Sequence, residues 1–342
     1  MAESKVDLAS LSLFRGTPAQ VEESRRRTFP QWGGTLSLTD YLARDVTMES
    51  GEHAKDGKLI TWVLAPRDDP TTLDFISTCE TYKRTGLVHE ANCYGVACVF
   101  TPPSKRGRGY ASHMMSLLHW VTASRANLPK FPEAWGAPPE EVADAGKGLF
   151  SVLYSDIGEE FYRSAGPGGK GGGWEKRSEI STIWEVGTEE GDDEGWKWLT
   201  EEQLNELWEP PRRHSRHTCQ RMVSADSTSQ SGFWGVESTR DPGTYASWSV
   251  DLRPPPTTLI VTRLCASEEM FPGLIVKIKQ AARRSGIEKV EVWNLRVGLK
   301  EVAEKTGGRT FMRNEHLPQI VWYGPEITGN VEWAYNEKFC WC

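Results

Sequence analysis

The hydrophobic pattern of residues 94–120 predicts a strand, a turn and a helix in direct succession. β-Branched and aromatic residues dominate 96–101, which is typical of a buried strand, and two prolines end it. After the basic turn 106–111, apolar residues recur every three or four positions up to Val121, as on the buried face of an amphipathic helix. Such a turn presents backbone N–H groups and a helix N-terminus, both of which attract anions.

The rest of the N-terminal half is predicted to contain further helices and strands. Capping residues favour helices from Thr17 to about Arg27 and from Ser37 to Glu49. The predicted strands lie over 58–65, 75–82 and 149–157, and a short helix follows over 159–165. With 96–101, the first two strands would form an antiparallel meander. The Pro-, Gly- and acid-rich insertion 128–148 is typical of a surface loop.

The C-terminal half repeats this order. Its predicted elements are strands over 245–250, 257–264, 289–294 and 318–323, and helices over 272–284 and 299–306. The turn after Leu264 carries Glu268 and Glu269, which would repel a phosphate, so one anion site per chain is expected.

The length of 342 residues exceeds that of a usual single core and predicts two domains. The acidic run Glu189–Glu194 marks the expected boundary between a first domain over 1–190 and a second over 195–342. The polar segment 210–231 is typical of an exposed linker.

Composition restricts the class of protein. The sequence contains no run of about 18 apolar residues, so no membrane span is predicted. Met1–Gly16 lacks the pattern of a signal peptide. Seven scattered cysteines favour a reduced, cytoplasmic protein. The net charge of −7 argues against a nucleic-acid binder and suits a cationic amine as partner. The sequence leaves the oligomeric state open.

Two groups of metal-binding residue types occur, His214, His217 and Cys219, and the pair Cys340 and Cys342. Neither has a complete set of ligands at suitable spacing, so no metal site is expected.

The turn Arg106-x-x-Gly109-x-Ala111 matches the [RQ]-x-x-G-x-[GA] signature of the GCN5-related N-acetyltransferases, the GNAT superfamily, in the strand–turn–helix context that this signature requires. The phrases Ser155–Tyr162, Cys79–Thr81 and Trp333–Cys342 resemble the fungal lysine-acetyltransferase (Lyc1-like) branch. The resemblance implies a mixed α/β GNAT fold in the N-terminal half. It also implies a degenerate GNAT-like C-terminal half that forms one wall of the acceptor cleft.

The resemblance further implies a site for acetyl-CoA as co-substrate. The turn would hold the pyrophosphate through backbone N–H groups, and its glycines would permit close approach. The strand before it would run beside the pantetheine arm, with an N–H at Val99 or Phe100 polarising the thioester carbonyl. Ser155 stands where many relatives carry a cofactor-binding Asn. The candidate cofactor-binding residues are therefore Val99, Phe100, Thr101, Arg106, Gly107, Arg108, Gly109, Tyr110, Ala111 and Ser155.

Tyr162 matches the general acid of the family, which protonates the CoA thiolate; the alternative is a tyrosine that only packs beside Phe161. Glu80 is the candidate base because it lies in an otherwise uncharged predicted strand. It either faces the cleft, where it would bind or deprotonate the substrate ammonium, or faces water on an edge strand.

Other residues are weaker candidates for the base. Glu90 and Asp156 are alternatives to Glu80, whereas His89 and His113 are expected to be solvated and packed, respectively. Cys98, within the predicted strand, is expected in the core, and no acylated cysteine is required.

These features predict an acetyl-CoA-dependent N-acetyltransferase that acts on a primary amine of a small molecule, possibly lysine, by direct attack. One alternative is acetylation of a toxin, polyamine or secondary-metabolite amine. The other is a non-catalytic, CoA-binding interaction protein. The presence of both Tyr162 and the complete turn favours an enzyme.

Overall fold

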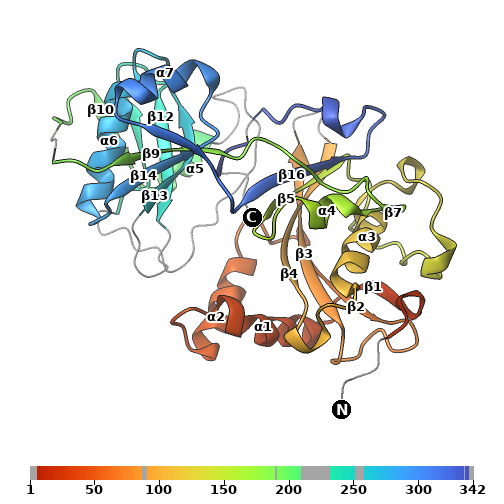
Figure 1. The fold of residues 1–342 in the computed structure, drawn as a ribbon. Coiled ribbons are helices and arrows are strands. Elements are labelled where there is room, and N and C mark those ends of the chain that lie inside the picture. Colours follow the sequence, from red (N-terminus) through yellow and green to blue (C-terminus); the bar gives the residue numbers. More distant parts are fainter. Residues whose placement is uncertain are drawn as a thin grey trace. The chain divides into compact units, whose positions relative to one another are not determined.

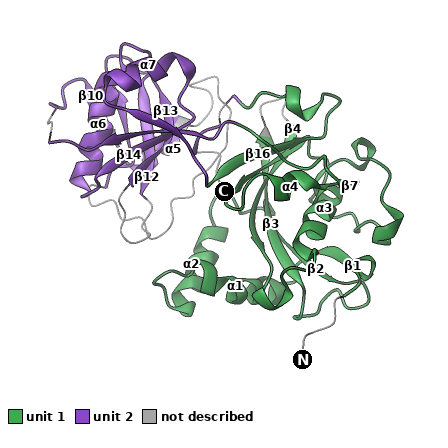
Figure 2. Cartoon of the chain, viewed as in Figure 1, with its two compact units in different colours: residues 1–177, 315–333, 342 green, residues 178–314, 334–341 purple. Residues whose placement is uncertain are grey.

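The computed structural model describes residues 6–86, 91–188, 191–208, 232–250, 258–334 and 336–338. The chain divides into two compact units (Figure 2). Unit 1 comprises residues 1–177, 315–333 and 342, and unit 2 comprises 178–314 and 334–341. The first boundary thus lies at 177 rather than near 190, and the chain returns to unit 1 after unit 2.

Unit 1 is built on a seven-stranded mixed sheet in the order β1-β2-β3-β4-β5-β16-β8 (Figure 1). The strands are β1 (Leu11–Arg15), β2 (Leu59–Pro66), β3 (Ser77–Gly86), β4 (Ala91–Phe100), β5 (Phe150–Ser155), β8 (Glu175–Lys176) and β16 (Leu317–Trp322). As predicted, β2, β3 and β4 form an antiparallel meander. β5 pairs parallel with β4, and β16 pairs antiparallel with β5.

Helices cover both faces of this sheet. They are α1 (Pro18–Trp32), α2 (Leu38–Glu49), α3 (Tyr110–Thr122) and α4 (Glu160–Ser164), and a small hairpin, β6 (Ala165–Gly166) and β7 (Gly169–Lys170), follows α4. Cys79 shares a core cluster with α3, whereas the neighbouring Thr78 accepts a hydrogen bond from Ser24 of α1. Because successive side chains of a strand point to opposite faces, α1 and α3 lie on opposite faces of the sheet.

The ends of α1 and α2 follow local chemistry. Thr17 and Gln20 form a reciprocal capping box at the start of α1, and the Ser37 hydroxyl caps α2 by accepting from the N–H of Asp40. α1 continues past the predicted end at Arg27 to Trp32 and includes Pro30.

Unit 2 has a second seven-stranded mixed sheet, in the order β10-β11-β12-β13-β14-β9-β15. The strands are β9 (Ile180–Glu185), β10 (Trp196–Leu199), β11 (Gly235–Ser238), β12 (Tyr245–Val250), β13 (Thr258–Cys265), β14 (Lys289–Trp293) and β15 (Arg309–Met312). The helices are α5 (Glu201–Trp208), α6 (Phe271–Arg284) and α7 (Val297–Lys305). β13 and β14 pair in parallel, like β4 and β5, and α6 follows β13 as α3 follows β4.

The two sheets take strands from distant parts of the sequence. β16, which follows all the strands of unit 2, pairs with β5 over six residue pairs. β9, which precedes the other strands of unit 2, pairs with β14. The strand predicted over 318–323 therefore exists but completes the first sheet and not the second. Its position depends on pairing partners, which a local pattern does not encode.

The described part of the acidic run, residues 191–194, is fixed within unit 2. The Lys277 ammonium on α6 is buried and donates to the carbonyl of Gly191 at 3.3 Å and to Asp193 Oδ1 at 2.9 Å. This run is thus attached to a core helix and does not form a free boundary.

Some predicted features lie outside the described residues, namely 210–231 with its His and Cys residues, and Cys340 and Cys342. Among the residues that the structure does describe, no three His, Cys, Asp or Glu side chains cluster as metal ligands. No helix in that same part of the chain is both long and apolar enough to cross a membrane.

Candidate active site

The turn 106–111 joins β4 to α3 and has the backbone of a cradle. Gly107 and Gly109 have φ angles of 74° and 83°, a region that side chains other than glycine enter at a cost of about 1–2 kcal/mol. A Cβ atom placed on either glycine would meet no atom within 4 Å, so the space in front of the turn is open. Gly109 is also the N-cap of α3, and no side chain caps this helix. The N–H groups of its first turn are therefore oriented toward open space, as an anion such as pyrophosphate requires.

Two basic residues flank these N–H groups. Arg106 is exposed, and its Nε donates to the carbonyl of Thr101 at 2.8 Å, which leaves the outer guanidinium nitrogens facing outward. Arg108 is partly buried. The positive charge and the backbone N–H groups together fit a diphosphate.

The side chains of Thr101 and Tyr110 are used inside the protein. The Thr101 hydroxyl bonds to Ser77 Oγ at 2.7 Å, and the Tyr110 hydroxyl accepts from the N–H of Val6 at 2.8 Å. Only the backbone groups of Thr101 and Tyr110 are thus available for the predicted contacts with acetyl-CoA.

β4 contains a β-bulge near its end. Between the pairs Glu80–Ala97 and Thr78–Phe100, β3 has one residue, Cys79, while β4 has two, Cys98 and Val99. Cys98 has a φ of 51° and is exposed. The prediction that Cys98 lies in the core is therefore wrong, because the bulge interrupts the in–out alternation of the strand.

β4 and β5 separate beside this bulge. Their parallel pairing ends at Gly95–Val152, although β4 continues to Phe100 and β5 to Ser155. Backbone groups of β4 near the bulge are thus not paired with β5. The arrangement suits an extended ligand that passes between the two strands.

Tyr162 on α4 packs at the α3 side of the sheet. It is 7% exposed, and its ring meets Phe161 and Trp174 edge-to-face at centroid distances of 4.9 Å and 6.2 Å. Burial, and then the neighbouring Cys79 and Asp156, raise the pKa of the Tyr162 phenol. The phenol is therefore protonated at neutral pH. Cys79 lies on β3 opposite the bulge, so Tyr162 is within electrostatic range of the β3 residue that faces the bulge.

Glu80 lies on the other face. β3 is an inner strand between β2 and β4, so the alternative of an edge strand is wrong. The Glu80 carboxylate accepts hydrogen bonds from the Tyr82 hydroxyl, at 3.1 Å, and from the Cys98 thiol. Burial raises the pKa of Glu80, and the hydrogen bonds from Cys98 and Tyr82 and the charge of Arg25 only partly offset this.

A charged cluster from α1 and α2 lies near Glu80. Arg25 forms ion pairs with Glu49 and, at 3.8 Å, with Asp45, and the charges of Arg25 and Asp45 act on the pKa of Glu80. Sequence analysis missed these residues because their helical segments carry no signature. Only the packing of α1 and α2 on the sheet brings them to β3.

The side chains of the remaining described candidates make their contacts elsewhere in the chain. The Ser155 hydroxyl donates to the carbonyl of Gly158 at 2.5 Å and accepts from the N–H of Ile157 at 3.2 Å, so it closes the turn before α4. Asp156 is 61% exposed and pairs with His316 at 2.9 Å. His113 is packed, as predicted, and burial lowers its pKa to about 4. Glu90 and His89 lie outside the described residues.

Known proteins are similar to this chain in its C-terminal part and in its fold. Residues 213–342 match the family described as LYC1 GNAT-like C-terminal domain. A GCN5-related N-acetyltransferase from Kribbella flavida superposes with a TM-score of 0.53 over 91% of this chain and 70% of that chain, at 14% identity. The chain therefore has the fold of a GCN5-related N-acetyltransferase, and its C-terminal part is similar to the LYC1 GNAT-like C-terminal domain. The predicted mixed α/β GNAT fold with a GNAT-like C-terminal half is thus confirmed.

Two further proteins are similar to this chain. A lysine acetyltransferase of Yarrowia lipolytica (strain CLIB 122 / E 150) is 26% identical over 178 residues, which are 50% of this chain and 42% of that protein. The chain therefore aligns with less than half the length of that relative. A GCN5-related N-acetyltransferase from Anabaena variabilis matches with a TM-score of 0.53 at 13% identity, over 92% of this chain and 73% of that one.

Proposed function

We propose that this GNAT protein transfers the acetyl group of acetyl-CoA to a primary amine of a small molecule. The observation that carries the proposal is the turn 106–111, in which two left-handed glycines precede an uncapped helix just after the bulged strand β4. Acetyl-CoA, when bound, supplies the acetyl thioester. Arg106, Arg108 and the first N–H groups of α3 would hold its pyrophosphate.

Glu80 and Tyr162 have the chemistry for the two proton transfers. The amine nitrogen attacks the thioester carbon, its proton passes to Glu80 directly or through water, and the C–S bond breaks. The departing thiolate would receive its proton from the Tyr162 hydroxyl. Glu80 shares the α1 face of the sheet and Tyr162 the α3 face, so base and acid would act from opposite faces of the sheet.

We propose lysine as the first acceptor to test. The support is the name of the Yarrowia relative, a lysine acetyltransferase, together with Glu80, Asp45 and Glu49 on one face of unit 1. Carboxylates in this arrangement suit any cationic amine, so polyamines, toxins and secondary-metabolite amines are the competing acceptors.

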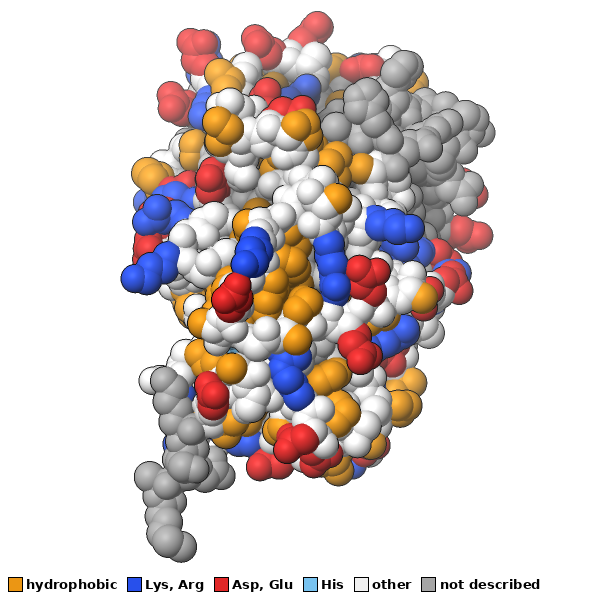
Figure 3. All heavy atoms as spheres, turned by 90° about the vertical axis from the view of Figure 1, so that its right-hand side faces the viewer, with side chains coloured by type: hydrophobic (Ala, Val, Ile, Leu, Met, Phe, Trp, Pro, Cys, Tyr) orange, Lys and Arg blue, Asp and Glu red, His pale blue; other side chains and the backbone are white. Residues whose placement is uncertain are grey.

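Nucleic acid fits the face drawn in Figure 3 poorly. Figure 3 shows one face of the molecule on which acidic and basic side chains alternate around hydrophobic ones. Over the described residues of that face there is no continuous basic patch of the kind that binds phosphate backbones.

The decisive experiment measures thiol release from acetyl-CoA with the full chain and a panel of amines that includes lysine, spermidine and simple alkylamines. Turnover with lysine above the other amines supports the proposal. If turnover is highest with another amine, that amine and not lysine is the acceptor. If the chain binds CoA but releases no thiol with any amine, it is a non-catalytic CoA-binding protein.

Replacing Tyr162 by Phe removes one hydroxyl and keeps the packed ring. If Tyr162 is the acid, turnover falls by about 10²-fold or more. CoA affinity and melting temperature should change little, because the edge-to-face contacts with Phe161 and Trp174 persist. Wild-type turnover in this variant would make Tyr162 a core residue only.

Replacing Glu80 by Gln should lower kcat/KM by about 10²-fold and change its pH dependence. A base works only when it is deprotonated, and burial places the pKa of Glu80 above the ordinary 4.5. The kcat/KM of the wild type should thus rise with pH through that raised pKa. This acidic limb of the pH profile should be absent in the Gln variant. Glu133→Gln, at a side chain that is 85% exposed, is the matched control. A variant that kept the acidic limb would exclude Glu80 as the base.

A further inference from the structure

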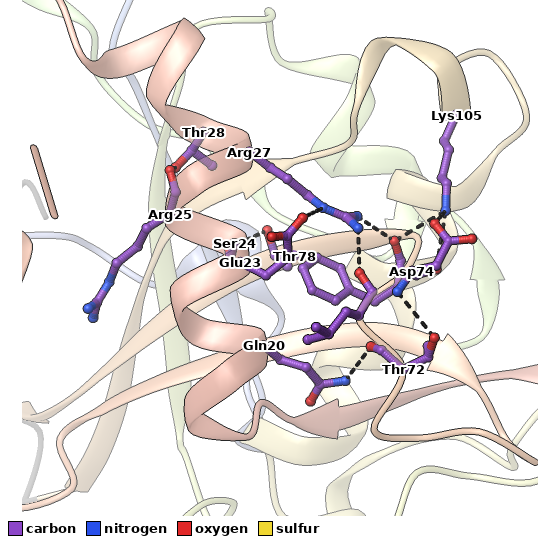
Figure 4. Close-up of polar contacts among 12 residues, drawn as sticks. Gln20, Glu23, Ser24, Arg25, Arg27, Thr28, Thr72, Asp74, Thr78 and Lys105 are labelled. Carbon is purple, nitrogen blue, oxygen red and sulfur yellow. Dashed lines mark hydrogen bonds and ion pairs between the residues drawn. The ribbon is translucent and has the colours of Figure 1, made fainter. Parts of the chain in front are cut away.

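Lys105 directly precedes the turn 106–111 and ends the short 3₁₀ turn η2 (Pro103–Lys105). Although it is basic and adjacent to the proposed phosphate site, its side chain is only 8% exposed. Its Nζ donates to Asp74 Oδ1 at 2.5 Å, to the carbonyl of Asp74 at 3.2 Å and to the carbonyl of Phe75 at 3.4 Å (Figure 4). An ammonium has three donors, so all of them are used within the chain.

The segment that receives Lys105 is itself held by α1. Arg27 donates from Nη1 to the carbonyl of Phe75 at 2.8 Å and from Nη2 to the carbonyl of Leu73 at 2.5 Å. Its guanidinium lies over the Phe75 ring at 4.1 Å, and Glu23 accepts from its Nε at 2.8 Å. Figure 4 shows Arg27 and Lys105 reaching this segment from two different elements.

Arg27 and Lys105 share one acceptor, because both donate a hydrogen bond to the carbonyl oxygen of Phe75. The Phe75 side chain is 1% exposed, so this junction is anchored in the core. The start of the turn is thereby tied to a rigid helix through two successive side chains.

We propose that Lys105 is a positioning residue for acetyl-CoA, which fixes the turn 106–111 through Asp74 and does not contact the phosphates. The proposal rests on the proposed function. Glycines at 107 and 109 leave the turn many backbone conformations, whereas pyrophosphate binding requires its N–H groups in one. The Lys105 anchor limits that freedom at the residue before Arg106.

The competing role is that Lys105 leaves Asp74 and binds a phosphate itself. Two variants separate the roles. Lys105→Met removes the ammonium in either case. Asp74→Asn weakens the contact between Lys105 and residue 74 but keeps the ammonium and makes it available to a phosphate. This variant therefore weakens CoA binding only if Lys105 acts by positioning the turn. Asp74 is 78% exposed, so Lys105→Met leaves no unpaired buried carboxylate. In Asp74→Asn the buried ammonium keeps the carbonyls of residues 74 and 75 as acceptors, so both variants should fold.

The test is calorimetry of the full chain with CoA, together with turnover of S-acetylpantetheine, a donor that lacks the pyrophosphate. We expect Lys105→Met to weaken CoA binding by roughly tenfold, and Asp74→Asn to weaken it less, since small misplacements of binding groups have effects of this order or larger. Turnover of S-acetylpantetheine should be unchanged, which a general loss of structure would not allow. Lys130→Met, at a lysine that is 83% exposed, is the control.

The outcomes are distinguishable. Asp74→Asn that binds CoA as tightly as the wild type, or more tightly, overturns the positioning role alone, and so does wild-type affinity in Lys105→Met. A wild-type chain that does not bind CoA overturns the proposed function, and this proposal with it. If Lys105→Met were to unfold, Asp74→Asn would still decide between the roles.

Discussion

Replacing Gly109 by Asp is expected to abolish acetyl-CoA binding and to leave the fold intact. The φ of 83° costs an L-residue about 1–2 kcal/mol, but Asp is among the residues that best tolerate this region. The new Cβ meets no atom within 4 Å, and a carboxylate at the N-cap of α3 favours the helix. The same carboxylate would occupy the place proposed for the pyrophosphate and repel it.

Gly109→Asn is the matched control, because its side chain has nearly the same shape and also caps helices but carries no charge. Calorimetry with CoA and thermal melting should be measured on both variants. We expect the Asp variant to show no binding and the Asn variant to retain part of it, at similar melting temperatures. Wild-type CoA affinity in a folded Asp variant would refute the assignment of the turn.

A fragment of residues 1–190 is expected to aggregate or to bind CoA only weakly. It lacks β16, which forms six residue pairs with β5 and buries Ile320 and Val321. It also lacks Tyr323, whose hydroxyl bonds to Nδ1 of the buried His119 at 2.8 Å. Because His119 Nε2 donates to the carbonyl of Ala165 at 2.9 Å, Nδ1 is the acceptor in this neutral ring and would lose its partner.

A second truncated protein can distinguish the effect of losing strand β16 from the effect of losing unit 2. The N–H of Arg177 bonds to the carbonyl of Pro318 at 2.8 Å, so a short Gly/Ser linker can join residue 177 to residue 315. We expect 1–177 fused to 315–333 to be soluble and to bind CoA. Amine preference should still change, if acceptor specificity depends on both halves as the sequence suggests. A soluble 1–190 fragment with full activity and unchanged amine preference would contradict both expectations.

Local patterns in the sequence were sufficient for most elements near the site. The spacing of apolar residues predicted α3, and the glycines of the turn predicted that a ligand could approach its backbone closely. The capping residues Thr17 and Ser37 placed the starts of α1 and α2. These features depend on contacts within a few residues, so each is encoded where it occurs.

The chemistry around the candidate base could not be predicted in this way. Glu80 acquires its raised pKa from burial on an inner strand, and its hydrogen bond from Cys98 exists because the bulge turns that residue outward. Arg25 and Asp45 reach it only through the packing of α1 and α2. The hydroxyl of the candidate Ser155 also closes a turn, whose geometry the sequence does not specify.

The sequence by itself indicated the GNAT fold and proposed the phosphate turn and the candidate acid, because each is carried by a short motif whose residues act through their own backbone or type. The tertiary structure alone decided that β16 belongs to the first sheet, that Cys98 is exposed and that Lys105 is turned away from the site. Strand partners, bulges and buried ion pairs join residues far apart in the chain. Their stability comes from burial and hydrogen bonding in the assembled fold, which no local pattern records.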